Sequence, residues 1–118
     1  LIFKFFANDL NKNLVFLLDT GANVGIISNS VKDVKSTVHH ITILDASGST
    51  IDCPVTDLRV SLMNRMLTQF VRMNIDSLVE SIQKETGIKI DGVISLAQMR
   101  MQLFATLRCK DLTLILEK

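Results

Sequence analysis

The sequence contains no tryptophan and no tyrosine, and its formal net charge is only +1. Proteins that bind single-stranded nucleic acid combine stacking aromatic side chains with dense clusters of Lys and Arg, and this chain lacks both features. We therefore expect no nucleic-acid partner. The longest apolar runs, Leu14–Leu18 and Leu112–Leu116 with Thr113 inside it, are far shorter than the roughly 20 residues that span a bilayer. No membrane span is expected.

Cysteine and histidine are also scarce. Cys53 and Cys109 lie far apart in strand-like segments, so two buried free thiols are favoured over a disulfide. The only histidines, His39 and His40, are adjacent, and adjacent residues of an extended segment point to opposite faces. They cannot jointly bind a metal, and we expect them at the surface or on an edge strand. Because no zinc motif is present, the sequence predicts neither a metal nor a cofactor.

The length of 118 residues and the 47% share of hydrophobic residues suit a single domain over residues 1–118 with one core. The chain begins with Leu1 rather than Met, which is consistent with a soluble domain cut from a longer or leader-bearing precursor. Its compartment is left open.

The hydrophobic pattern predicts a mainly β domain with one or two short helices. One helix begins near Asp76, which can cap it, and Gly87 follows its last turn. A second helix is expected over Leu96–Leu103. Short apolar and alternating segments between turn-forming residues predict the strands. The expected strands cover residues 1–7, 14–18, 23–28, 41–44, 50–53, 55–62 and 66–75, and residues 105–108 and 112–116 are expected to form a terminal hairpin.

The motif with chemical content is Asp19-Thr20-Gly21-Ala22, which directly follows the apolar strand Leu14–Leu18. A core strand that ends at this point leaves Asp19 at the strand end, and Gly21 permits the tight turn that follows. The structural alternative is that Asp19 only stabilises this turn.

The stretch Phe16–Ala22 resembles the signature of the retropepsin-like aspartic proteases, which is two apolar residues followed by Asp-Thr-Gly-Ala. A second family-like stretch is Asp91–Ile94, an Asp-Gly pair followed by two aliphatic residues, which in the family crosses behind the catalytic loop. Here Ser95 stands where the family has another glycine. The resemblance implies a retropepsin-like closed β-barrel (the acid-protease fold) with a flap hairpin and one or two short helices.

The resemblance also implies roles for individual residues. Ile41–Leu44 and Thr50–Cys53, separated by the small-residue tip 45–49, would form the flap that closes over a bound peptide. Asp19 would be catalytic, and the hydroxyl of Thr20 would brace two catalytic loops across a dimer axis. The remaining predicted site residues are Gly21 as active-site support and, as substrate-binding residues, Ala22, Asn23, Ser47, Gly48 and Ser49.

One copy of the motif supplies only half of an aspartic protease site. The chemistry needs two carboxyl groups that share a proton, and the chain has no second Asp-Thr-Gly or Asp-Ser-Gly. The resemblance therefore implies a C2 homodimer in which Asp19 and its symmetry mate activate a water molecule to hydrolyse a peptide or protein substrate. The alternative is a non-catalytic dimerisation or peptide-binding module that has kept the fold and lost turnover.

The half-site argument predicts self-association. Sedimentation equilibrium of the purified chain, from low to high micromolar concentration, should show a monomer converting to a dimer. A strict monomer throughout this range would contradict the composite site, because a single Asp19 cannot supply both carboxyl groups.

Overall fold

The computed structural model describes residues 1–44, 47–62, 64–103, 105–108 and 113–116. These residues form eleven strands and two helices. In chain order the elements are β1 (Ile2–Ala7), β2 (Lys12–Asp19), β3 (Gly25–Ser28), β4 (Ser36–Leu44), β5 (Thr50–Thr56), β6 (Val60–Leu62), β7 (Arg65–Leu67), β8 (Phe70–Met73), α1 (Asp76–Thr86), β9 (Gly92–Ser95), α2 (Leu96–Leu103), β10 (Ala105–Arg108) and β11 (Thr113–Leu116).

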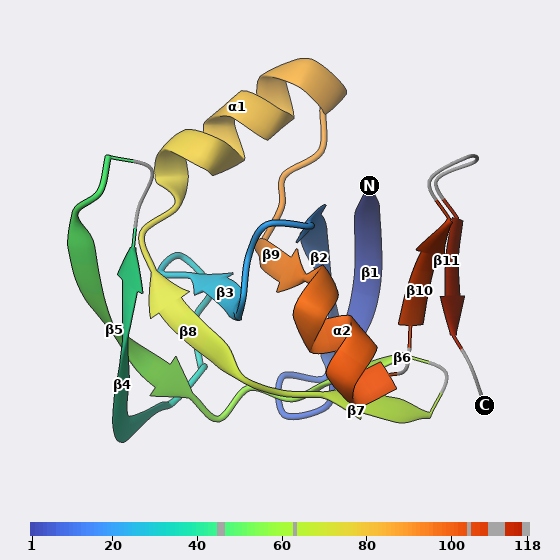
Figure 1. Ribbon diagram of the computed structural model, residues 1–118, viewed down its shortest axis with the longest axis horizontal. Coiled ribbons are helices and arrows are strands. Elements are labelled where there is room, and N and C mark those ends of the chain that lie inside the picture. Colours follow the sequence, from blue (N-terminus) through green and yellow to red (C-terminus); the bar gives the residue numbers. More distant parts are fainter. Residues whose placement is uncertain (45–46, 63, 104, 109–112, 117–118) are drawn as a thin grey trace.

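Nine of the strands form one mixed sheet in the order β4-β5-β8-β3-β9-β2-β1-β6-β7, and β10 and β11 pair as a separate hairpin (Figure 1). The β2–β9 and β3–β8 pairs are parallel, and the other pairs are antiparallel. The expected terminal hairpin and the hairpin of β4 and β5 are therefore confirmed. Neither helix in the described part of the chain is long and apolar enough to cross a membrane.

The prediction of a closed β-barrel is wrong, because the nine-stranded sheet is open, with β4 and β7 at its edges. Closure would require these two strands to pair with each other. The chain beside β7 is instead held by α2: the Arg65 guanidinium donates to the Leu103 carbonyl at 2.7 Å, and the Thr68 N–H donates to Gln102 Oε1 at 2.7 Å. The helix therefore anchors the edge at which a barrel would close.

The sheet buries side chains on both faces. Alternate residues of β2 point to opposite sides, as the pleat requires. Leu14 and Phe16 belong to the cluster that includes the buried face of α2, while Val15 and Leu17 pack against the cluster that contains Val79 of α1. The two helices therefore cover opposite faces of the sheet; in Figure 1, α2 lies in front of the strands and α1 lies at their upper end.

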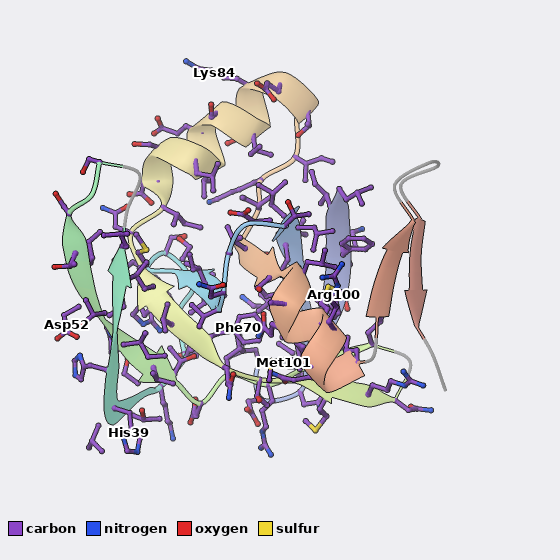
Figure 2. The ribbon with its side chains drawn as sticks, in the orientation of Figure 1. His39, Asp52, Phe70, Lys84, Arg100 and Met101 are labelled. Carbon is purple, nitrogen blue, oxygen red and sulfur yellow. The ribbon has the colours of Figure 1, made fainter. Side chains whose placement is uncertain are left out.

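Phenylalanine rings fill the centre of the cluster under α2. Phe16 contacts Phe5 at a centroid separation of 5.8 Å and Phe70 at 5.3 Å, and all three side chains are fully buried. Figure 2 shows Phe70 near the middle of the molecule, beside α2. Unlike Trp and Tyr, which the chain lacks, these Phe side chains need no hydrogen-bond partner when buried.

The predicted helices are confirmed, but the predicted cap of α1 is wrong. Gly87 adopts a left-handed φ of 74° and its N–H donates to the Gln83 carbonyl at 2.8 Å, as expected for a C-terminal cap. Asp76 lies within the first turn and makes no capping hydrogen bond. Asn74 precedes the helix, and its Oδ1 accepts a hydrogen bond from the Asp76 N–H at 3.0 Å.

Two predicted long strands are interrupted. The segment 55–62 is divided between β5 and β6 because the hydroxyl of Thr56 donates to the Phe70 carbonyl at 2.7 Å and accepts from the Leu58 N–H at 3.4 Å, which turns the chain. The segment 66–75 is divided between β7 and β8 at Gln69, which has a φ of 70°. Both bends place large apolar side chains, Leu58 and Phe70, in the core.

Gly92 is predicted to be intolerant of any side chain. A Cβ at this position would collide with the Ile26 carbonyl oxygen and lie 2.8 Å from a ring carbon of Phe16. Gly92→Ala should lower the free energy of unfolding by about 3 kcal/mol or more, measured by urea denaturation. Gly21→Ala is the control, because its Cβ would meet only Asp19 Oδ1 at 3.6 Å, and it should change the unfolding free energy by less than about 1 kcal/mol. Equal losses in the two variants would contradict this packing.

Candidate active site

Asp19 is the last residue of β2, and the fold fixes its position through β9. Asp19 is aligned with Ser95 in the parallel β2–β9 pair, and on its other side β9 pairs with β3, with Val93 opposite Ile26. β9 therefore lies between β2 and β3, the two strands that the loop 20–24 connects. Gly92–Ile94, within the stretch that resembles the family's crossing segment, lies beside Phe16–Leu18 of β2.

The carboxylate of Asp19 is held by its own turn. The Gly21 N–H donates to Asp19 Oδ1 at 2.9 Å, a local hydrogen bond typical of Asp at the start of a turn. The side chain nevertheless remains exposed. The turn therefore orients the carboxylate without burying it, which leaves it accessible to water, to a peptide or to a second copy of the chain.

A cavity of about 560 Å³ lies next to Asp19. One wall is the loop and the start of β3, and another is the stretch Ile41–Leu44 of β4. Four consecutive strand residues can line the same cavity only if it meets the strand along its backbone edge, because their side chains alternate between faces. The cavity therefore lies between the Asp19 loop and the edge of β4.

The structure brings some of the predicted site residues together and separates others. Asp19, Gly21, Ala22 and Asn23 line the cavity, whereas Thr20 is exposed and is not among the lining residues. The tip residues 47–49 are also exposed and lie outside the lining set, while positions 45 and 46 fall outside the described residues. The arm of the hairpin, rather than the described part of its tip, faces Asp19. The roles assigned to these residues stay predictions.

Asp19 is the single ionisable side chain that lines the cavity within the described part of the chain; the other lining residues are apolar or uncharged. The histidines lie elsewhere. Both are exposed on β4, and His40 Nδ1 lies 3.4 Å from Asp52 Oδ2 in a surface pair. Figure 2 shows His39 and Asp52 on the outside of the hairpin, away from α2. They offer no general acid or base to the cavity.

Sequence reasoning noted only that Ser95 stands where the family has another glycine, and it missed the importance of this residue. Its side chain is fully buried, and its hydroxyl donates to the Ala22 carbonyl at 2.6 Å. The hydroxyl also accepts from the Gln98 N–H at 3.2 Å, while Gln98 Oε1 accepts from the Ser95 N–H at 3.3 Å. This reciprocal pair is a capping box, and the spacing Ser-x-x-Gln was the sequence signal that could have revealed it.

No family model and no curated protein matches the sequence. Among solved structures, the chain is similar to a Legionella pneumophila (subsp. pneumophila str. Philadelphia 1) protein of unknown function, DUF785. The TM-score is 0.49 at 15% sequence identity, and the match covers 83% of this chain and 82% of that chain. A likeness at this level carries no information about function.

Cys53, on β5 of the same hairpin, is a buried free thiol, as predicted; Cys109 lies outside the described residues. Burial raises the pKa of the Cys53 thiol above its ordinary value of 9.0, and the nearby Asp52 carboxylate raises it further. The folded protein therefore favours the protonated thiol.

In a Cys109→Ser background, Cys53 should react with a thiol reagent at pH 8 at least about tenfold more slowly than in the urea-unfolded chain, measured by absorbance. Because the folded pKa lies above the unfolded one, the protonated thiol adds stability below pH 9.0, and this contribution is lost as the pH rises through the folded value. Equal reaction rates in folded and unfolded protein would contradict the burial of Cys53.

Proposed function

We propose that this chain is one protomer of a dimeric aspartic-type endopeptidase and that its resemblance to the retropepsin-like proteases reflects this chemistry. The observation that carries the proposal is the placement of Asp19. Its carboxylate ends a core strand, is oriented by the Gly21 N–H at 2.9 Å and borders a cavity of about 560 Å³. The proposal does not include a closed barrel.

The shape of the cavity favours an extended peptide as the substrate. Among the described strands, β4 pairs only with β5, so every second residue of β4 directs its N–H and C=O away from that partner. An extended chain placed along Ile41–Leu44 can hydrogen-bond to these groups, while Val24, Ile26 and Met73 provide apolar contacts for its side chains. Such a peptide would lie between β4 and the Asp19 loop.

The proposed reaction uses a water molecule held between Asp19 and the partner's Asp19. One carboxylate accepts a proton from the water as it attacks the scissile carbonyl, and the other, protonated, carboxyl group supplies a proton as the peptide bond breaks. No covalent intermediate with the protein forms. The exposure of Asp19 and of the adjacent Thr20 leaves both side chains accessible to a second copy of the chain.

One observation favours a second candidate function, a peptide-binding module without turnover. The cavity is lined by one chain alone and contains a single carboxylate, so a monomer could bind a peptide there without cleaving it. Isothermal titration calorimetry with peptides, alongside mass spectrometry of the same mixtures, separates the two functions. Binding that leaves every peptide intact, in protein shown to be dimeric, identifies the module.

Asp19→Asn should lower peptide cleavage by at least about 100-fold while leaving folding and dimerisation intact, because the amide cannot take the proton from water. Mixing this variant with wild-type protein sharpens the test. If both carboxylates of a dimer are needed, and mixed dimers form freely, activity should follow the square of the wild-type fraction. Cleavage of a peptide pool by mass spectrometry provides the rate.

Asp33→Asn is the matched control, because Asp33 is an exposed aspartate in a turn with a φ of 68°, a conformation that Asn tolerates. It should leave cleavage unchanged. A wild-type rate in Asp19→Asn would overturn the proposed chemistry, and a linear dependence on the wild-type fraction would overturn the shared site.

A further inference from the structure

The fully buried hydroxyl of Ser95 has two partners that lie in different parts of the fold. It donates to the carbonyl of Ala22, a residue of the candidate active-site loop, at 2.6 Å, and it accepts from the Gln98 N–H in the first turn of α2 at 3.2 Å. The bond to the half-buried Ala22 fixes the loop backbone at that point, because its donor is a buried hydroxyl that has no access to water as an alternative partner. The loop is therefore attached to α2 through one side chain.

Gln98 extends this connection to the other end of the loop. Its Nε2 donates to the carbonyls of Thr68 and Gln69, the latter at 3.3 Å. The same Gln69 carbonyl accepts a hydrogen bond from the N–H of Gly25, where the loop enters β3, at 3.3 Å. The side-chain amide of Gln98 thus holds the Gln69 carbonyl, to which the end of the loop is hydrogen-bonded through Gly25.

The space around Gly25 shows how closely these parts fit. A Cβ at Gly25 would lie 2.8 Å from Gln98 Oε1 and 2.6 Å from a ring carbon of Phe70. The loop therefore packs directly on the glutamine that caps α2 as well as bonding to its partners. Movement of α2 along its axis would displace the loop at both Ala22 and Gly25.

We propose that Ser95 and Gln98 are positioning residues that set the orientation of the Asp19 carboxylate by fixing the loop at Ala22 and Gly25. The kinetic part of this inference rests on the proposed peptidase function. It gives Ser95 a task that glycine cannot perform, because the departure from the family pattern supplies the hydroxyl on which the network depends. Neither side chain contacts the cavity, so both act through the loop rather than on the substrate.

The test is Ser95→Ala, with Ser28→Ala as the matched control. Both serines are fully buried, but the hydroxyl of Ser28 bonds to the side chain of Ser30, away from the loop. Protein labelled with ¹⁵N-glycine gives a small set of resonances, because the chain has only 5 glycines. Ser95→Ala should shift the resonances of Gly21 and Gly25 and leave those of Gly48 and Gly87 in place, whereas Ser28→Ala should leave Gly21 in place.

The kinetic readout is the division between kcat and KM. Ser95→Ala should lower kcat on the order of tenfold and change KM by less than about twofold, because the carboxylate loses its orientation while β4 still binds the peptide. Ser28→Ala should leave both constants unchanged. If Ser95→Ala leaves kcat and the Gly21 and Gly25 resonances at their wild-type values, or if both variants behave alike, the proposal is overturned.

Two further outcomes keep this inference separate from the proposed function. If wild-type protein cleaves no peptide, the peptidase proposal fails, and the glycine resonances still decide whether Ser95 positions the loop. If Ser95→Ala does not fold, the exchange rate of the Ser95 hydroxyl proton in the wild-type protein decides whether the network forms. A slowly exchanging hydroxyl signal with contacts to Ala22 supports the network, and a signal lost to rapid exchange with water overturns it.

Discussion

The arrangement of the candidate site depends on Asp91, which fixes the start of β9 between two other strands. Its N–H donates to the Val15 carbonyl at 2.7 Å, and its Oδ2 accepts from the Val15 N–H at 2.9 Å, so both backbone groups of one β2 residue are satisfied by Asp91. Its carbonyl accepts from the N–H of Ser28 at the end of β3, at 2.9 Å. One residue therefore joins the middle of β2 to the end of β3 that is furthest from the loop that connects the two strands.

The residues that follow Asp91 extend this arrangement toward Asp19. Gly92 has no side chain because the Ile26 carbonyl and the Phe16 ring occupy the space. Val93 and Ile94 then point to opposite faces of the sheet, and each belongs to a different core cluster. The Ser95 hydroxyl donates a hydrogen bond to the Ala22 carbonyl. Within five residues, the segment therefore binds two neighbouring strands through Asp91, contributes core side chains through Val93 and Ile94, and caps α2 through Ser95. These three sets of contacts together fix the position of the Asp19 loop.

The sequence predicted the local features of this site better than its surroundings. The apolar run into Asp19 and the glycine after it predicted the strand and the turn, because both depend on near neighbours in the chain. The limits of α2 were predicted correctly for the same reason. The open sheet was not predicted, because alternating strands have the same pattern whether or not their edges meet. The hydrogen bonds of Arg65 and Gln102, which hold α2 beside β7, join residues far apart in the sequence and leave no periodic signal.

The open sheet also bears on how the candidate site would work. The Asp19 carboxylate accepts a hydrogen bond from the Gly21 N–H of its own turn and is exposed, and no second carboxylate lines the cavity within the described chain. The edge of β4 across the cavity offers main-chain groups, which recognise an extended backbone without regard to its sequence. Under the proposed function, α2 and β9 hold the Asp19 loop in place and β4 binds the peptide. Under the proposed function, hydrolysis by shared protonation needs one more carboxylate, which a second copy of the chain would supply at the exposed face of Asp19.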